Sequence, residues 1–314
     1  MLIAGKSLLE ESQIRNRFEL GFENMEIAIP TESLAVPEYA IALLRRYPSN
    51  FVSFHTAHRT PDGDETGLGM RSKSKRRRVL EVMKRSMELA HEAQPGTQLV
   101  IHVGEALTPE SNTPGAPGDT HREFFLEEIA ELRDHARENC PGLTLTLEHC
   151  TPLAVFDGYL HYREWGIDWT YMNLVRNAGF NDIVKATLDF PHASYYAEFA
   201  RRWGMERGFQ DFFDAFGDDL SLIHLANPNG AKREFISTIA RHSWGFRDDS
   251  AEDLETLREI SGLLLRNRYD GPVIIEIQLE DYGDAAEVLR NAELFERVYS
   301  ESKSQENSPS TPKR

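Results

Sequence analysis

The sequence predicts an α/β fold in which eight parallel strands close into a (β/α)8 TIM barrel. Three observations support this: short apolar runs alternate with helical patterns, eight such units fit into 314 residues, and most runs end in a histidine or a carboxylate. Runs that are apolar throughout indicate strands covered on both faces. An open, doubly wound sheet is the alternative, but its Gly-x-Gly-x-x-Gly turn does not follow the first run.

The composition limits the classes of function. A hydrophobic content of 40% is enough for a large core, and a formal net charge of -16 disfavours nucleic acid and anionic membranes as partners. No apolar run approaches the ~18 residues of a membrane span, and the apolar start of the chain is too short for a signal peptide. Two cysteines, Cys140 and Cys150, form no disulfide framework, which suits a reducing cytoplasm. We therefore expect a cytoplasmic protein.

The elements expected in the first half of the chain follow from the apolar pattern. Apolar runs predict strands at residues 2–5, 25–29, 51–55, 98–103 and 143–148. Helical stripes between them predict helices at residues 7–20, 39–47 and 74–92, and a further helix that ends near residue 139.

The second half of the chain continues the alternation. Residues 152–180 are aromatic and less periodic, and we interpret them as mostly helical. Further strands are expected at residues 183–189, 220–224 and 273–277, with helices at 193–216, before 268 and at 284–299. Pro191 cannot donate to a sheet, so the sixth strand should stop at Asp189. The domain boundaries are thus 1–298 for a single barrel domain and 299–314 for a disordered tail, whose composition cannot bury apolar surface.

Polar residues end six of the predicted strands. In strand order they are His55, His102, Glu148, Asp189, His224 and Glu276. Because the carboxyl ends of barrel strands converge on one mouth, polar residues there are typical of an active site. Carboxylates with a single imidazole favour Mn2+, Mg2+, Co2+ or Zn2+ over copper or an iron–sulfur cluster. Without a cation, three carboxylates this close would raise one another's pKa values.

These motifs resemble the xylose isomerase-like TIM barrel superfamily. The resemblance rests on His55, His102-Val103-Gly104, Glu148, Asp189-Phe190-Pro191-His192, His224 and Glu276, and it covers residues 2 to about 298. The superfamily contains sugar and sugar-phosphate isomerases and epimerases, inosose dehydratase and endonuclease IV. The resemblance implies that Glu148, Asp189, His224 and Glu276 hold one divalent metal ion, and that His192 contacts a substrate hydroxyl.

The implied activity is isomerisation or epimerisation of a sugar, polyol or sugar phosphate. It requires two bases at a carbon next to a carbonyl, and Glu148 and Glu276 are the candidate catalytic pair. An inosose-type dehydratase would use the same groups to eliminate water. A barrel that binds a sugar without converting it is the non-enzymatic alternative.

The resemblance to endonuclease IV implies the main alternative, a metal-dependent phosphodiesterase acting on abasic DNA. In that case His55 and His102 would join Glu148 around a second metal ion. That family also has an Asp-x-His motif after the seventh strand. Here the histidine is present as His242, but Ala240 replaces the aspartate, which argues against a three-metal site. The negative net charge argues against DNA binding as well.

Further residues are candidates for substrate contact because they lie in loops after the strands. A cluster of basic residues at 71–78 opens the helix after the third strand, where cations oppose the helix dipole and a substrate phosphate would explain them. The predicted substrate-binding residues are His192, His58, Arg59, Lys232, Arg233 and His242. A small carbohydrate is the expected partner, and a homo-oligomer is left open.

Overall fold

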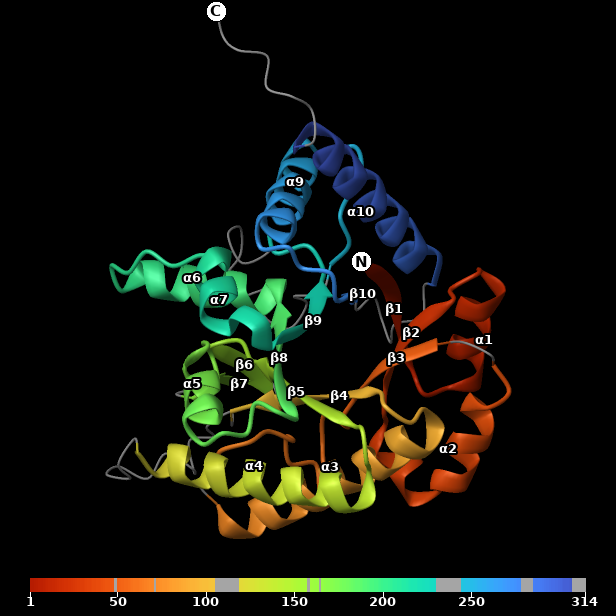
Figure 1. Ribbon diagram of the computed structural model, residues 1–314, viewed down its shortest axis with the longest axis vertical. Helices are drawn as coiled ribbons and strands as arrows, with labels where there is room; N and C mark the ends of the chain where they lie inside the picture. Colours follow the sequence, from red (N-terminus) through yellow and green to blue (C-terminus); the bar gives the residue numbers. More distant parts are fainter. Residues whose placement is uncertain are drawn as a thin grey trace, which may run out of the picture.

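Eight parallel strands close into a barrel, with helices around the outside (Figure 1). The computed structural model describes residues 1–47, 50–70, 72–104, 119–156, 159–163, 165–229, 244–277 and 285–306. Around the barrel the strands follow the order β1-β2-β3-β4-β5-β8-β9-β10, and β10 pairs with β1. The predicted (β/α)8 fold class is therefore confirmed, and the open sheet is excluded.

The strands and helices alternate along the chain as predicted. The barrel strands are β1 Leu2–Leu8, β2 Asn24–Ala28, β3 Asn50–His55, β4 Gln98–Val103, β5 Thr144–His149, β8 Val184–Asp189, β9 Leu220–Leu225 and β10 Pro272–Ile275. The helices are α1 Glu11–Glu19, α2 Pro37–Leu44, α3 Lys73–Ala93, α4 Asp119–Asn139, α5 Thr170–Asn177, α6 Phe190–Arg202, α7 Phe209–Phe216, α9 Ala251–Arg266 and α10 Ala285–Glu306, with short 3-10 turns η1 Thr31–Ala35 and η2 Gly217–Asp219. None of these helices is long and apolar enough to cross a membrane.

The main core lies between the strands and the helices. Met83 and Met87 of α3, Phe125 of α4, Tyr171 of α5 and Phe295 of α10 are completely buried against the outer faces of the strands. Burial of large apolar side chains on this scale is the dominant stabilising contribution in a fold of this kind. This core between strands and helices therefore holds the strands in place, and the strands in turn set the positions of the side chains that point into the barrel.

The barrel interior changes from apolar to polar toward the carboxyl ends of the strands. A small apolar cluster is formed by Ala4, Val100, Leu222 and Ile274, which are fully buried. Two residues further along the same strands, and hence on the same face, come Lys6, His102, His224 and Glu276. The apolar layer thus lies directly below the polar layer inside the barrel.

Asp189 ends β8, as predicted, and caps α6. Its Oδ1 accepts a hydrogen bond from His192 N at 2.5 Å, so the helix begins at Phe190 and not at residue 193. The predicted continuous helix over 193–216 is also wrong, because α6 and α7 are separate. Gly204 between them has a φ of 76°, in the left-handed region where helices end.

The segment from 152 to 180 was predicted to be mostly helical, and this is wrong in its first part. An antiparallel hairpin, β6 Leu153–Phe156 with β7 Tyr159–Tyr162, precedes α5. Valine, phenylalanine and tyrosine in these short runs favour strands over helices. Among the described residues of the segment, 170–177 form its α-helix.

The last helix extends further than the sequence predicts. α10 continues to Glu306, so the prediction of disorder is wrong for residues 299–306. Ser302 and Ser304 donate hydrogen bonds back to the carbonyl oxygens of Val298 and Ser300, both at 2.9 Å. A polar helix end can extend into solvent without burying apolar surface, and glutamate, lysine and glutamine are good helix formers. Residues 307–314 lie outside the described part of the chain.

Candidate metal centre

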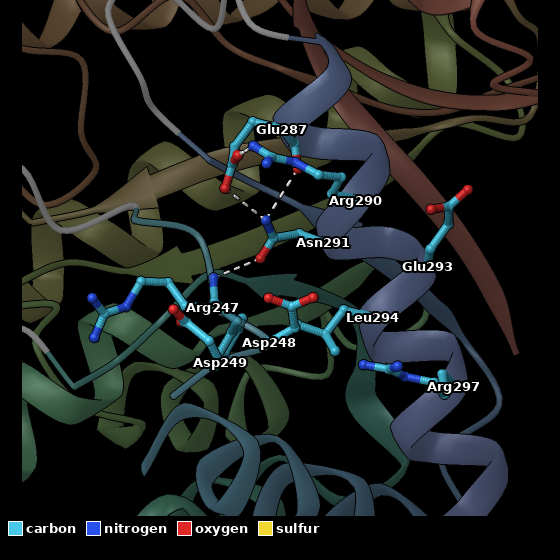
Figure 2. A pocket seen from close by; sticks show the side chains of 10 residues that line it. Arg247, Asp248, Asp249, Glu287, Arg290, Asn291, Glu293, Leu294 and Arg297 are labelled. Carbon is cyan, nitrogen blue, oxygen red and sulfur yellow. Dashed lines mark hydrogen bonds and ion pairs between the residues drawn. The ribbon is translucent and has the colours of Figure 1, made fainter. Parts of the chain in front are cut away.

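A surface cavity of about 590 Å3 lies on the outside of the barrel, between residues 246–249 and α10 (Figure 2). Phe246 N donates to Asn291 Oδ1 at 2.6 Å, and Asn291 Nδ2 donates to Glu287 Oε1 at 3.0 Å. Arg290 forms an ion pair with Glu287 on the same helix. These contacts join the segment 246–249 to α10, so we assign the cavity a structural role.

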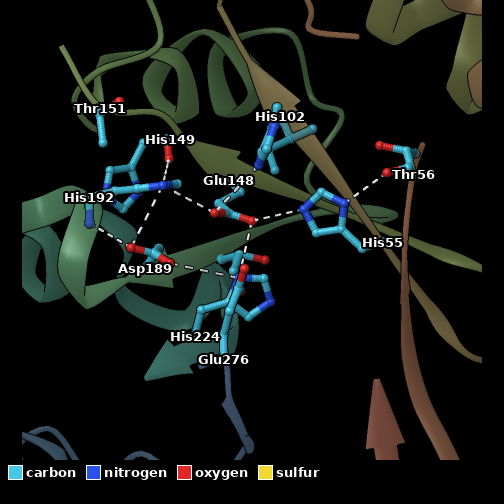
Figure 3. A network of polar contacts seen from close by, with 12 residues as sticks. His55, Thr56, His102, Glu148, His149, Thr151, Asp189, His192, His224 and Glu276 are labelled. Atoms are coloured by element: carbon cyan, nitrogen blue, oxygen red, sulfur yellow. Dashed lines mark hydrogen bonds and ion pairs between the residues drawn. The ribbon is translucent and has the colours of Figure 1, made fainter. Parts of the chain in front are cut away.

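The polar residues at the strand ends lie together inside the barrel mouth (Figure 3). The structure brings together the residues predicted as metal ligands, which are His55 on β3, His102 on β4, Glu148 on β5, Asp189 on β8, His224 on β9 and Glu276 directly after β10. The last four come from strands that are neighbours in the barrel. All but His102 are buried, and the His102 side chain is 14% exposed.

Glu148 lies at the centre of the group, with imidazole rings around both of its carboxylate oxygens. Oε2 is 3.2 Å from His224 Nδ1 and 3.4 Å from His55 Nε2. Oε1 is 3.1 Å from His192 Nδ1 and 3.6 Å from His102 Nε2. Because the side chain is only 2% exposed, these rings and not bulk water determine its electrostatic environment.

His224 has carboxylates on both sides of its ring. Nε2 lies 3.1 Å from Glu26 Oε2. Nδ1 lies 2.8 Å from Glu276 Oε2 and 4.0 Å from Asp189 Oδ2. A carboxylate that accepts from one ring nitrogen selects the tautomer whose other nitrogen can bind a metal ion. Nδ1 is therefore the candidate ligand atom.

The atoms around His224 Nδ1 have the spacing of a coordination shell. Neighbouring ligand atoms of an octahedral ion with bonds of ~2.1 Å stand ~3.0 Å apart. The distances from His224 Nδ1 to Glu276 Oε2 and Glu148 Oε2 are 2.8 and 3.2 Å. Within the described residues, these three buried atoms meet other side chains of the same cluster and have no further hydrogen-bond partner. Glu148, Asp189 and His224 offer atoms close enough to share one ion, and Glu276 Oε2 lies beside the same His224 nitrogen, so the residues fit a divalent cation.

A group of three imidazoles lies beside this shell. The ring centroid of His55 is 4.6 Å from that of His58 and 4.7 Å from that of His102. His55 Nδ1 donates to the carbonyl oxygen of Thr56 at 2.9 Å, which directs Nε2 toward Glu148. One nitrogen from each ring lies close enough to the others to share an ion. This group is the candidate for the second metal position.

Lys6 and Glu26 form the floor of the site, and the sequence interpretation did not single them out. Both side chains are fully buried, and Lys6 Nζ lies 3.1 Å from Glu26 Oε1 and 2.8 Å from Glu276 Oε1. The two residues are register partners on β1 and β2. The signal in the sequence was a charge inside each apolar strand: Leu2, Ala4 and Lys6 alternate onto one face.

Burial and neighbouring charges shift the pKa values of the acids in opposite directions. Burial raises the pKa of Glu26, but His224 and Lys6 outweigh it and lower that pKa to about 2. Burial, reinforced by Glu148, raises the pKa of Asp189 to about 7 against the effect of nearby imidazoles. Without a cation, Asp189 is thus the acid of the site that holds a proton near neutral pH.

We expect metal binding to strengthen as the pH rises through about 7. Burial lowers the pKa of His224, but Glu26 and Glu148 raise it well above its usual value, so the metal-free imidazole is protonated. Metal ligands must lose their protons. The pKa of about 7 of Asp189 alone makes binding ~10-fold weaker at pH 6 than at pH 8, and loss of the His224 proton increases this difference. Calorimetric titration with Mn2+ at both pH values measures this change, and equal affinities would contradict it.

The same raised pKa affects the stability of the metal-free protein. The pKa of Asp189 is about 7 in the folded protein and about 4 in an unfolded chain, so protonation of this side chain favours the folded state. This contribution to the free energy of unfolding is complete below pH ~4 and is lost as the pH rises through about 7. A bound cation removes that loss, so metal should raise the melting temperature more at pH 8 than at pH 6.

Two of the predicted substrate contacts lie at the site. His192 is buried, and its Nδ1 donates to the carbonyl oxygen of His149 at 2.8 Å while lying beside Glu148. His58 is exposed at the mouth, with its ring against His55. His192 is therefore placed to influence Glu148, and His58 is placed to meet an incoming molecule.

The remaining predicted contacts are not brought to the site by the described residues. The guanidinium of Arg59 donates to the carbonyl oxygen of Gly63 at 3.2 Å and so binds its own loop. This contact differs from the expected role, because the short loop folds back on itself. Lys232, Arg233 and His242 lie outside the described residues.

Three basic residues at the start of α3 are paired with acids. Lys75 Nζ lies 3.3 Å from Asp64 Oδ1, and Arg78 binds the same carboxylate. Arg76 lies 3.2 Å from Glu127. These three residues therefore have protein partners and do not need a substrate phosphate to explain them.

Comparison with known proteins agrees with this geometry. The sequence matches the xylose isomerase-like TIM barrel family over residues 15–292. The chain belongs to this family. The resemblance seen in the strand-end motifs is therefore confirmed. A search of curated proteins finds no match.

Several solved structures share the barrel of this xylose isomerase-like protein. 3-Keto-D-glucoside 4-epimerase YcjR from E. coli has a TM-score of 0.63 at 16% identity, covering 96% of this chain and 99% of that chain. A D-tagatose 3-epimerase-like protein also gives 0.63, at 18% identity with 96% and 99% covered. An AP endonuclease, family 2, from Brucella melitensis gives 0.57 at 16% identity, with 91% and 97% covered. Identities this low show a common fold and leave the reaction to be argued from the site.

Proposed function

We propose that this protein is a divalent-metal-dependent isomerase or epimerase that acts on a sugar, a polyol or a sugar phosphate. The observation that carries the proposal is the pair of carboxylates, Glu148 and Glu276, whose Oε2 atoms both lie within 3.2 Å of His224 Nδ1. Asp189 lies within ion-sharing distance of Glu148 and His224, and with Glu276 it completes the proposed shell of three carboxylates and one imidazole. This shell suits a hard divalent cation such as Mn2+ or Mg2+, or the intermediate Co2+ and Zn2+.

Glu148 and Glu276 are the proposed bases of the reaction. One carboxylate removes the proton from a carbon beside a carbonyl group, and the other returns a proton to the opposite face, which inverts that carbon. For isomerisation the same groups move a proton between two neighbouring carbons. A bound divalent cation would polarise the carbonyl oxygen and so make the adjacent C–H group more acidic.

The two proposed bases differ in their neighbouring side chains and in their exposure. Glu148 Oε1 lies 3.1 Å from His192 Nδ1 and 3.6 Å from His102 Nε2, so imidazole rings surround this carboxylate. The side chain of Glu276 is 11% exposed, whereas those of Glu148, Asp189 and His224 are at most 3% exposed. Glu276 is therefore the acid of the shell that is most open to a molecule entering the mouth.

Proton exchange with solvent tests the proposal across a set of candidate substrates. The Mn2+-loaded protein is incubated in D2O with ketopentoses, ketohexoses, their phosphates and keto-inositols, and 1H NMR follows the C–H groups next to each carbonyl. We expect deuterium to enter one substrate at this carbon, and a chelator to stop it. A dehydratase would lose water after the same proton removal. A metal-loaded protein that changes no carbohydrate of the set would count against the proposal.

A second candidate function is metal-dependent cleavage of abasic DNA. It is favoured by the group His55, His58 and His102 beside Glu148, which offers a second metal position. The net charge of -16 works against a DNA-binding surface.

Metal analysis of His55→Ala separates the two candidates. We expect about one ion per chain in both the wild type and the variant, because His55 is not one of the four proposed ligands. Elemental analysis of protein purified without chelator measures this number. Two ions in the wild type and one in the variant would instead favour the phosphodiesterase, and abasic DNA would be the next substrate to test.

The domain bounds, the partner and the cellular location are also proposed from the sequence. The predictions are a barrel domain over residues 1–298, a small carbohydrate as partner and a cytoplasmic location. The oligomeric state is left open.

A further inference from the structure

We infer that Lys6, Glu26 and Ser53 form a positioning chain that holds His224 and Glu276 in the geometry of the metal shell. The inference rests on the proposed metal centre and assigns a role to residues beneath it. Lys6, Glu26 and Ser53 are fully buried, so they act through the proposed ligands and do not touch a substrate.

The chain follows one row of the barrel. Lys6 on β1 is the register partner of Glu26 on β2, which is in turn the register partner of Ser53 on β3. Ser53 Oγ donates to Glu26 Oε2 at 2.6 Å, and Lys6 Nζ lies 3.1 Å from Glu26 Oε1. Both oxygens of Glu26 are thus held from neighbouring strands, which fixes the carboxylate against His224 Nε2.

The first consequence concerns the ring of His224. With Nε2 donating to Glu26, the nitrogen that can bind a metal is Nδ1, which lies on the side of Glu148, Asp189 and Glu276. Carboxylate partners of this kind orient metal-binding histidines and increase their basicity. Without Glu26, the ring could rotate or adopt the other tautomer.

The second consequence concerns Glu276. Lys6 Nζ binds its Oε1 at 2.8 Å, so Oε2 is the oxygen left for the shell. Glu26, His224 and Glu276 also have ligand atoms close enough to share a metal ion. The Lys6 ammonium lies beside both of these glutamates. Lys6 supplies the positive charge at that position and restricts a divalent cation to the other side of His224.

The cost of these buried charges supports a function for them. Transfer of ionised groups into a barrel interior is unfavourable, and apolar side chains of similar volume are often equally or more stabilising. One layer below, the barrel uses such apolar side chains at Ala4, Val100, Leu222 and Ile274. A purely structural ion pair would contribute to stability and leave metal affinity unchanged, and this difference can be measured.

Titration of the full-length, metal-free protein with Co2+, followed by visible absorption, tests the inference. Glu26→Gln should raise the Kd for Co2+ by ~10–100-fold, the usual effect of losing such a partner. Ser53→Ala, a smaller change, should raise it by a smaller factor and alter the Co2+ spectrum in the same direction. Ser221→Ala is the matched control, since it removes a partly buried hydroxyl that donates to Thr146 Oγ1 at 3.4 Å in the same barrel, and its Kd should equal that of the wild type.

The outcomes separate the positioning chain from the metal centre. Wild-type Kd and spectrum in both folded Glu26→Gln and folded Ser53→Ala would overturn the inference while leaving the metal centre intact. If Glu26→Gln does not fold, Ser53→Ala decides by itself. A wild-type protein that binds no Co2+ would overturn the metal centre and the inference together.

Discussion

Replacing Glu148 with glutamine should abolish turnover and leave the barrel folded. An amide cannot accept the substrate proton, and the loss of a general base alone costs about 10²–10⁴-fold in rate. The substitution also removes a carboxylate whose Oε2 lies 3.2 Å from His224 Nδ1, so it should weaken metal binding as well. Glu276→Gln should have the same effect on turnover. The rate of deuterium entry from D2O measures both variants, at saturating metal.

Asp219→Asn provides the matched control for this experiment. Asp219 is a buried carboxylate at the amino end of β9, where it pairs with Arg176 at 2.6 Å and Lys185 at 3.0 Å. Its loss should lower stability and leave the exchange rate per folded molecule unchanged. Full exchange activity in either Glu148→Gln or Glu276→Gln would refute the two-base mechanism.

Lys6→Met should destabilise the metal-free protein by about 3–5 kcal/mol, the usual result of removing one partner from a buried ion pair. The side chain is nearly isosteric, so the main change is the loss of the ammonium group that lies 3.1 Å from Glu26 and 2.8 Å from Glu276. The two buried carboxylates then lose the ammonium group that they share, and the His224 ring alone lies against both of them. Denaturant unfolding in the presence of a chelator measures the free energy of unfolding.

The charge origin of this effect can be separated from a packing defect. Protonation relieves the repulsion between the carboxylates, so the difference from the wild type should shrink as the pH falls from 8 toward 5. The control Lys185→Met removes a 28% exposed lysine whose partner Asp219 keeps Arg176, and it should cost much less. A Lys6→Met protein within about 1 kcal/mol of the wild type at pH 8 would show that the ion pair is dispensable.

The sequence was sufficient to predict the barrel and the ends of several strands. β1 is an exception, because it runs to Leu8 and not to residue 5, and the helix after it begins at Glu11 and not at residue 7. Strands that are buried on both faces are continuous apolar runs, and a polar residue at the end of such a run marks the place where the strand meets solvent or a site. This is why β3 and β8 end at His55 and Asp189, as predicted. Since the strand ends of a barrel converge, their residues could be placed together from the topology alone.

The floor of the site could not be predicted in the same way. Lys6 lies near the amino terminus, where a lysine usually reaches solvent, and Glu26 lies inside an apolar strand. Only the register between β1 and β2 shows that the two charges are paired. Long-range pairing of this kind depends on how the barrel closes, which no local pattern encodes. The hairpin β6–β7 and the polar end of α10 were missed because the prediction relied on apolar periodicity and burial, which identify neither segment.

An anomalous difference map from a crystal grown with Mn2+ would show directly whether the barrel mouth holds a metal ion. We expect one strong peak inside the mouth, bonded to Glu148, Asp189, His224 Nδ1 and Glu276 Oε2, with Lys6 retained at the other oxygen of Glu276. A mouth without a peak, or a peak held by His55, His58 and His102 with the four proposed ligands empty, would contradict it.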